Sequence, residues 1–235
     1  MASGRLHVPL SRPEDVIPHL GAAHHWKEGR SAKSLVDQWW AARGLPQSVS
    51  NLLDQSGIWR RAGLIDAFVE RRTDLEDGRA TASQTDLLAI VAIESGLGVI
   101  GIEAKVDEGF DKTVDEWLAD ASPGKTARLA KLCALFDLSP NSVGELRYQL
   151  FHRTAAAIIE ARRYRAGHAA MVVQSWSSKL DGFEDYSRFF HALGIDGLES
   201  GRLSAPLIIG GTVFCTGWLV EEVPPSTIAG PRPAA

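Results

Sequence analysis

Residues 98–106 read GVIGIEAKV, and this stretch decides how the rest of the chain is interpreted. Every second residue is apolar, as the buried face of a strand requires: Ile100, Ile102, Ala104 and Val106. The positions between them place Glu103 and Lys105 together on the other face, just after Gly101. Because unpaired charge near a core is costly, this face is a candidate for chemistry.

The preceding segment predicts the partner strand. Residues 85–94 read TDLLAIVAIE, which is almost continuously apolar and typical of a strand covered on both faces. Together with the next strand it predicts an antiparallel hairpin, which brings Asp86 toward Glu103. A strand is also expected over 64–72, and it supplies Glu70 as a further candidate ligand.

The turn between the two strands decides whether these carboxylates meet. SGLG is expected to be a short loop, and a symmetric turn centred on 96–97 would place Asp86 opposite Asp107. Convergence of Asp86 with Glu103 requires a turn nearer 94–95, or a bulge that shifts the pairing.

Two carboxylates beside a lysine suit a hard divalent cation. Mg²⁺ takes oxygen ligands, usually one or two carboxylates completed by water and substrate phosphate. We expect Asp86 and Glu103 to hold Mg²⁺ or Mn²⁺, with the backbone carbonyl of Ala104 as a third ligand. Lys105 is expected to hold the attacking water, and Gly101 to leave room for a substrate backbone. The alternative is that Glu103 and Lys105 pair on a solvated sheet edge.

Asp86, Glu103 and Lys105 resemble the D…ExK signature of the PD-(D/E)xK phosphodiesterase superfamily, the fold of many restriction and repair nucleases. The expected element order is similar to its core. The whole chain also resembles a group of uncharacterised bacterial proteins that share HHWKEGRSAKSL, EAKVDE, SPGK and LRYQLFHRTA. The resemblance implies a restriction endonuclease-like α/β fold, in which helices flank a mixed central sheet with an antiparallel hairpin. It also implies a Mg or Mn cofactor, a nucleic acid partner and, as in many nucleases of this fold, a homodimer.

Helices and strands alternate along the chain, which predicts one α/β domain over 1–222 followed by a disordered tail, 223–235. Residues 1–30 are expected to be irregular. Helices are expected at 31–43, 46–56, 113–120, 125–138, 143–165 and 183–193. Strands are expected at 64–72, 85–94, 98–106 and 168–176, with one or two more in 205–223 divided at Gly210-Gly211. Ser31 is the expected N-cap of the first helix.

The segment ELRYQLFHRT lies on the expected helix 143–165 and carries several polar groups. The resemblance implies that Gln149 faces the metal site as a catalytic positioning residue. Arg147, His152 and Arg153 group near it and are candidate phosphate contacts. The alternative is that these side chains form only the solvated face of an amphipathic helix.

Residues 119–126, ADASPGKT, fit a loose phosphate-binding loop pattern. However, the preceding segment is expected to be a helix rather than a strand, and Pro123 removes a backbone amide where phosphate would bind. The segment therefore predicts a helix start, with Ser122 as N-cap and Pro123 as the first helical residue. Lys125 remains a candidate substrate contact.

Composition narrows the class of protein. The net charge of −4 does not favour global nucleic acid binding, although a local groove can still be basic. Cys133 and Cys215 lie in apolar segments without metal-ligand spacing, which predicts reduced core thiols in a cytoplasmic protein.

No signal peptide or membrane-spanning run is present, so no membrane partner is expected. His24 and His25 lack zinc-site spacing, and the basic segment around Trp26 is a candidate nucleic acid contact.

The sequence therefore favours metal-dependent hydrolysis of phosphodiester bonds in DNA or RNA. Two alternatives stay open. One is a catalytically inactive nucleic-acid-binding or regulatory module of a bacterial defence or repair system. The other is an enzyme that acts on a small phosphorylated metabolite, which would use Lys125 and Arg147.

Overall fold

The computed structural model describes residue 7 and residues 9–222, which build a mixed α/β fold around one sheet. The strands are β1 (Gly63–Thr73), β2 (Ser83–Ile93), β3 (Gly96–Lys105), β4 (His168–Ser175), β5 (Leu207–Ile209) and β6 (Thr212–Val220). The six strands lie in the order β1-β2-β3-β4-β6-β5. The pairs β1–β2, β2–β3 and β5–β6 are antiparallel, whereas β3–β4 and β4–β6 are parallel. The predicted mixed sheet with its antiparallel hairpin is confirmed, and the expected tail 223–235 lies outside the described residues.

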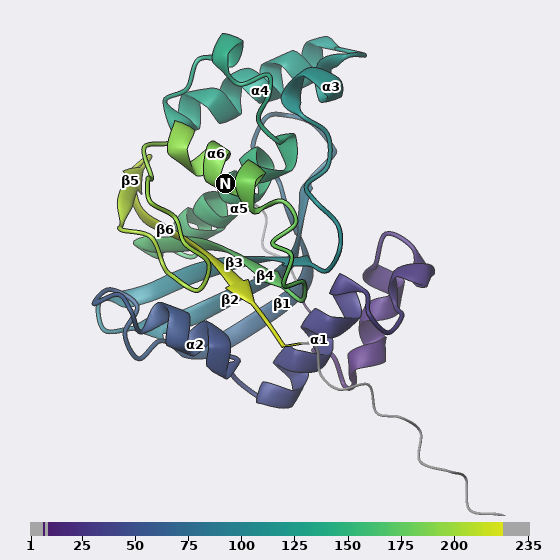
Figure 1. The fold of residues 1–235 in the computed structure, drawn as a ribbon, viewed down its shortest axis with the longest axis vertical. Helices are drawn as coiled ribbons and strands as arrows, with labels where there is room; N and C mark the ends of the chain where they lie inside the picture. Colours follow the sequence, from purple (N-terminus) through teal and green to yellow (C-terminus); the bar gives the residue numbers. More distant parts are fainter. Residues whose placement is uncertain (1–6, 8, 223–235) are drawn as a thin grey trace, which may run out of the picture.

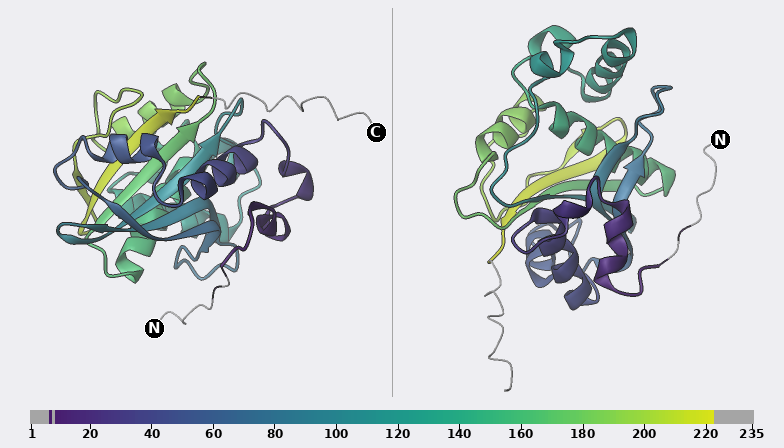
Figure 2. Two further views of the ribbon diagram at one scale, coloured as in Figure 1. Left: turned by 90° about the horizontal axis from the view of Figure 1, so that it is seen from below. Right: turned by 90° about the vertical axis from the view of Figure 1, so that its right-hand side faces the viewer.

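Helices cover both faces of the sheet (Figures 1 and 2). One face carries α1 (Ser31–Ala42) and α2 (Gln47–Leu53). The other carries α5 (Tyr148–Arg163) and α6 (Phe183–Ala192), while α3 (Val114–Leu118) and α4 (Pro123–Phe136) lie farther from the sheet, with α4 packed on α5 (Figure 1). Short 3₁₀ helices occur at Pro13–His19, Ala23–His25 and Pro140–Ser142, the first two in the segment expected to be irregular. Because both faces are covered, β2 is apolar on both, with Leu88 and Ile90 in the core under α5 and Leu87 and Ala89 in the core over α1.

The hairpin of β2 and β3 turns at Glu94–Ser95. Ile93 pairs with Gly96, and the ladder runs to Leu87–Ile102. The prediction that SGLG forms the loop is wrong, because the two-residue turn leaves residues 96–98 inside β3. This is the register that the convergence of Asp86 with Glu103 required, and no bulge is needed in β3 to reach it.

Two helix starts differ from the sequence prediction. The helix expected from residue 143 begins at Tyr148, because the backbone before it pairs with the segment at 112–114 instead of continuing a helix. Arg147 is the N-cap of α5 and forms an isolated bridge with Thr113. Ser31 is the first residue of α1, and its N-cap is Arg30.

Other local predictions are confirmed. The Ser122 side chain caps α4 by accepting a hydrogen bond from the Lys125 N–H, and Pro123 is the first helical residue. The turn at residues 210–211 divides β5 from β6. Cys133 and Cys215 are buried free thiols. Within the described chain, no helix is long and apolar enough to span a bilayer.

Gly101 was expected to leave room for a substrate, but it packs against α5. A Cβ at this position would lie 3.3 Å from the Cβ of Ala157 on α5 and 3.6 Å from the Cγ2 of Thr85. The expectation that Gly101 leaves room for a substrate backbone is therefore wrong. The glycine lets α5 approach β3 closely, which places the first turns of α5 over the end of the hairpin.

We expect Gly101→Val to lower the free energy of unfolding by about 1–3 kcal/mol, because the added side chain presses α5 away from β3. Urea denaturation measures the change. Gly63→Val is the control, since a Cβ at this strand position meets nothing within 4 Å. Equal stability of the two variants would contradict the close packing of α5 on β3.

Candidate active site

The site begins where the pairing of β2 with β3 ends. The last backbone pair is Leu87–Ile102, and beyond it the Asp86 carboxylate takes over, with Oδ2 accepting the Ala104 N–H at 2.7 Å. In a strand the N–H and C=O of one residue point to the same edge, so the Ala104 carbonyl also faces the Asp86 side. Two oxygen groups named as candidate ligands, Asp86 and the Ala104 carbonyl, thus lie on one edge of β3.

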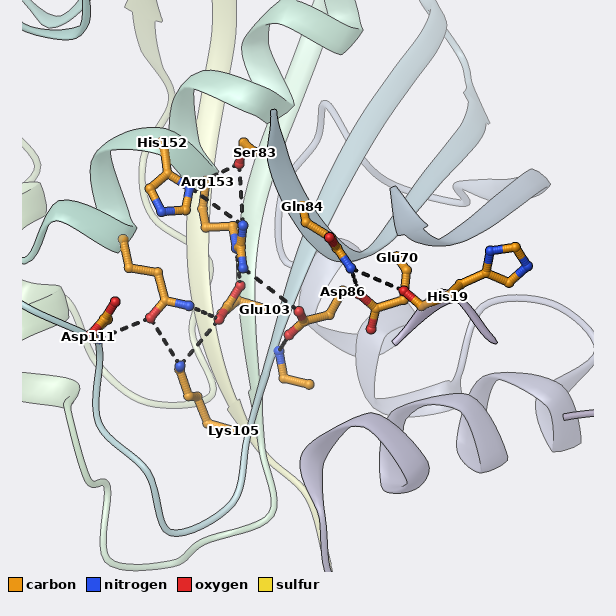
Figure 3. Close-up of polar contacts among 12 residues, drawn as sticks. His19, Glu70, Ser83, Gln84, Asp86, Glu103, Lys105, Asp111, His152 and Arg153 are labelled. Carbon is orange, nitrogen blue, oxygen red and sulfur yellow. Dashed lines mark hydrogen bonds and ion pairs between the residues drawn. The ribbon is translucent and has the colours of Figure 1, made fainter. Parts of the chain in front are cut away.

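Glu103 is the centre of the polar contacts in Figure 3. Its Oε1 accepts a hydrogen bond from Gln149 Nε2 at 2.5 Å and lies 3.2 Å from the Lys105 Nζ. Its Oε2 accepts from Arg153 Nε at 2.5 Å. The Glu103 side chain is 3% exposed, against 22% for Asp86, so Asp86 is the more accessible of the two carboxylates.

Helix α5 supplies the groups that surround Glu103. Gln149 and Arg153 are one turn apart on the same helix face, and both contact Glu103. Gln149 Oε1 accepts from the Lys105 Nζ at 3.3 Å and from the Asp111 N–H at 3.2 Å, so the amide is fixed at both ends. The structure therefore brings Gln149 to the site, as the sequence predicted.

Arg153 lies between the two carboxylates. Its Nη2 is 4.0 Å from Asp86 Oδ1, while its Nε binds Glu103. Its Nη1 donates to the Ser83 Oγ at 3.3 Å, and the side chain is 12% exposed. The sequence analysis named Arg153 as a phosphate contact, but in this structure it forms an ion pair with Glu103.

The charges of the site shift the pKa values of its two carboxyl groups in opposite directions. Burial, and then the charge of Glu103, raises the pKa of Asp86 to about 8, while the Arg153 charge opposes this shift. Burial also acts to raise the pKa of Glu103, but the charges and hydrogen bonds of Arg153 and Lys105 outweigh it and lower that pKa. The pair therefore carries one firmly ionised carboxylate, Glu103, and one that binds a proton near neutral pH.

Glu70 lies in β1, opposite Asp86 of the neighbouring strand β2, at a point where the ladder is interrupted. The ladder pairs Val69 with Leu87 and Arg71 with Thr85, but it skips Glu70 and Asp86. Glu70 has a φ of 53°, a left-handed conformation that is uncommon for a residue other than glycine.

The kink at Glu70 changes which β1 residues face α5. Phe68 before the kink packs on Tyr164, and Thr73 after it donates to Glu160. Glu160 lies on α5 and Tyr164 is its C-cap, so both contacts are on the α5 side, although strict alternation puts residues an odd number apart on opposite faces. The Glu70 Oε2 accepts from Gln84 Nε2 at 2.5 Å. Burial raises the pKa of Glu70, with a smaller contribution in the same direction from the charge of Glu103.

The other predicted contact residues are engaged elsewhere. His152 Nδ1 lies 2.9 Å from the Ser83 Oγ, and burial followed by the charge of Arg153 holds its pKa well below 6.5, so this imidazole is neutral at pH 7. Arg147 forms an ion pair with Asp185 at 2.8 Å.

Lys125 donates to the Trp117 carbonyl at 2.8 Å and pairs with Asp120. In the basic segment, Lys33 lies 5.5 Å from the Trp26 ring and pairs with Glu28 and Asp37.

Ser83 and Asp111 are site residues that the sequence analysis did not identify. Ser83 contacts both His152 and Arg153 because the irregular end of β2 turns it toward α5. The Asp111 N–H positions Gln149 from a loop whose path depends on the bridge between Thr113 and Arg147. No periodicity or motif in the sequence marks either contact.

The ligand set fits a hard cation. It consists of two carboxylates and a backbone carbonyl, which are the oxygen donors that Mg²⁺ and Mn²⁺ prefer. Among residue 7 and residues 9–222, no three His, Cys, Asp or Glu side chains group as a metal site by themselves. A cation at Asp86 and Glu103 would therefore rely on Ala104, water and substrate to complete its coordination.

A family model described as a domain of unknown function, DUF6946, matches residues 9–223. The chain belongs to this family. The DUF6946 match spans all six strands and includes every residue of the site from Glu70 to Arg153. Searches of the curated proteins and of the solved structures give no match.

We expect Glu70→Gly to be more stable than Glu70→Ala by about 1 kcal/mol, because only glycine adopts the left-handed conformation without cost. Chemical denaturation of both variants tests this order. At Arg72, in the same strand without a positive φ, the order is expected to reverse, with Ala more stable than Gly. The same order at both positions would contradict the strained backbone at Glu70.

We expect Asp86→Asn to stabilise the metal-free protein by an amount that grows as the pH rises from about 5 to 8. With its pKa raised from 3.8 to about 8, Asp86 keeps a proton in the folded state that it has lost in the unfolded state. The wild type therefore loses stability over this range, whereas the asparagine does not titrate and still accepts the Ala104 N–H. Thermal melts across this pH range measure the difference, with the exposed Asp107→Asn as control. A pH-independent difference would contradict the raised pKa.

Proposed function

We propose that the chain is a metal-dependent nuclease that hydrolyses phosphodiester bonds in DNA or RNA. The observation that carries this proposal is the convergence of Asp86, Glu103 and Lys105 at the end of one hairpin, under the first turns of α5. Asp86 and Glu103 each lie one residue beyond the last pair of the β2–β3 ladder, Leu87–Ile102. The resemblance to the PD-(D/E)xK superfamily supports the same assignment.

In this proposal, Asp86, Glu103 and the Ala104 carbonyl hold Mg²⁺ or Mn²⁺. The bound ion would lower the pKa of a water molecule and stabilise charge on a phosphoryl oxygen. A mononuclear site of two carboxylates leaves coordination positions for water and for substrate phosphate. Because its pKa is raised, Asp86 carries a proton near neutral pH, and this proton must leave before the carboxylate becomes a full ligand.

Lys105 and Gln149 position the nucleophile. The Lys105 Nζ is held 3.2 Å from Glu103 Oε1 and 3.3 Å from Gln149 Oε1, and it lies 4.9 Å from the Phe110 ring. This buried ammonium can donate to an attacking water and stabilise the charge that develops on the phosphate. Gln149 is a positioning residue, because it touches Glu103 and Lys105 and orients both.

A hollow beside the site gives room for a polyanionic chain. It has a volume of about 1110 Å³ and lies along β1, between the N-terminal segment and the connection to β2. Glu70 lines it, so it adjoins the carboxylates without covering them. Its lining includes three arginines, Arg71, Arg72 and Arg79, and three acidic side chains, Asp66, Glu70 and Asp74. The arginines are the groups in this hollow that a phosphate could contact.

A second candidate function is an inactive nucleic-acid-binding module. The observation that favours it is the ion pair of Arg153 with Glu103, which satisfies the buried carboxylate without a metal. The metabolite enzyme receives no such support, because Lys125 and Arg147 are held by Asp120 and Asp185.

We expect the full chain to cleave DNA or RNA oligonucleotides in Mg²⁺ or Mn²⁺ and not in EDTA. Glu103→Gln and Lys105→Met are each expected to lower the rate by about 100-fold or more, the usual effect of removing a transition-state contact. Single- and double-stranded substrates, labelled at one end and resolved on denaturing gels, report both rate and position of cleavage.

Asp107→Asn is the matched control for these variants, since this exposed carboxylate lies two residues beyond Lys105. It is expected to keep the wild-type rate. Cleavage that survives in Glu103→Gln would assign the activity to another site or to a contaminant. Metal-independent binding of the oligonucleotide without cleavage would instead favour the inactive module.

A further inference from the structure

The Glu103 carboxylate is already bound on both oxygens by protein donors. Oε1 contacts Gln149 and Lys105, and Oε2 accepts from the Arg153 Nε at 2.5 Å. The Glu103 side chain is 3% exposed, so protein donors rather than bulk water satisfy the carboxylate. A cation that binds Glu103 together with Asp86 would lie beside these donors and compete with the one on the Asp86 side.

Arg153 is the partner on the Asp86 side. Its guanidinium reaches both carboxylates, with Nε on Glu103 and Nη2 4.0 Å from Asp86 Oδ1 (Figure 3). A positive charge thus stands where an ion shared by the two carboxylates would lie. Two cations in this position would repel each other at short range in a poorly solvated site.

We propose that Arg153 is the resident cation of this site: a divalent ion displaces it from Glu103, and the displaced guanidinium binds a substrate phosphate. The identity of the ion and of the substrate rests on the proposed function. The competition between Arg153 and a divalent cation requires a cation site at Asp86 and Glu103 but no cleavage of a substrate.

The contacts of the three donors indicate which one moves. The Oε1 of Gln149 is held by the Asp111 N–H and by Lys105, and Lys105 lies against the Phe110 ring. Beyond Glu103, the contacts of Arg153 are long: the Ser83 Oγ at 3.3 Å, the His152 Nδ1 at 3.5 Å and the Asp86 Oδ1 at 4.0 Å. A guanidinium also matches a phosphate with two parallel hydrogen bonds.

This exchange couples the metal to the substrate. A phosphate that accepts Arg153 removes the competitor from Glu103 and so raises metal affinity, and by linkage the metal raises phosphate affinity to the same extent. The protein would bind the metal weakly alone and more tightly when a phosphodiester is present. Arg153 then acts both as a placeholder and as a substrate contact.

Titration of the full chain with Mn²⁺, followed by the electron paramagnetic resonance of the free ion, tests the competition without any turnover. Arg153→Gln is expected to bind Mn²⁺ about tenfold more tightly than the wild type, within the usual scale of coupling between ligands. Arg162→Gln is the matched control, because this arginine lies on the same helix but donates to the Gly210 carbonyl, away from Glu103, and the Mn²⁺ affinity of this variant should equal the wild type. Asp86→Asn is expected to lose the binding.

Dimethyl phosphate, a phosphodiester without a cleavable chain, tests the second half of the proposal. It is expected to tighten Mn²⁺ binding to the wild type and to leave Arg153→Gln unchanged. Equal tightening in both proteins would overturn the role of Arg153 as the phosphate contact.

Equal or weaker Mn²⁺ binding by Arg153→Gln would overturn the competition. If this variant does not fold, Arg153→Lys replaces it. The lysine keeps the charge but lacks the Nε contact, so tighter Mn²⁺ binding than in the wild type is still expected, and unchanged binding overturns the proposal. Cleavage by the wild type without a gain of affinity in the variants would refute only this inference. A gain of affinity without cleavage by any protein would refute only the nuclease.

Discussion

The site depends on one hydrogen bond at the end of the β2–β3 ladder, where a side-chain carboxylate replaces a backbone carbonyl as the acceptor. Where the strands separate, Asp86 accepts the Ala104 N–H that a β2 carbonyl would otherwise satisfy. This keeps a buried donor paired, and it also holds a carboxylate beside Glu103. Without this contact, the end of the hairpin would have an unsatisfied backbone group, and Asp86 would have no reason to face inward.

Helix α5 completes the arrangement because it lies unusually close to β3. Gly101 allows the Ala157 methyl group to approach the strand, and the same helix then carries Gln149 and Arg153 over Glu103. The charge on Glu103 is supported by groups from one strand and one helix that are themselves fixed by packing. A mutation in the apolar contact between α5 and β3 therefore also acts on the electrostatics of the site.

Much of the fold and part of the site could be predicted from the sequence. The apolar alternation of residues 98–106 and the continuous apolar run in β2 predict the hairpin, since burial on both faces leaves few other arrangements. Gln149 was expected to face the site through resemblance, and in the structure it contacts Glu103 and Lys105. The loop was predicted at SGLG, whereas the chain turns at Glu94–Ser95, the position that convergence of Asp86 with Glu103 required.

The remaining features depend on tertiary contacts that no local pattern encodes. The start of α5 was predicted five residues too early, because Val143 and Leu146 are buried as a helix would bury them, yet their backbone pairs with a distant segment. The ion pair of Arg153 with Glu103 joins groups 50 residues apart and could not be distinguished from a solvated helix face. The kink at Glu70 is likewise invisible in a strand of ordinary composition.

A second buried ion pair under α5 shows what a purely structural pair looks like in this protein. Arg71 donates to Glu160 at 2.7 Å, and the two side chains are 3% and 1% exposed. Arg71 meets one carboxylate there, and the Thr73 hydroxyl also donates to Glu160. At Glu103 the balance differs, because Asp86 adds a second carboxylate whose pKa is raised and which solvent can reach. A buried pair that served stability alone would gain nothing from this extra carboxyl group, whereas a site that exchanges a proton or a guanidinium for a metal ion requires it.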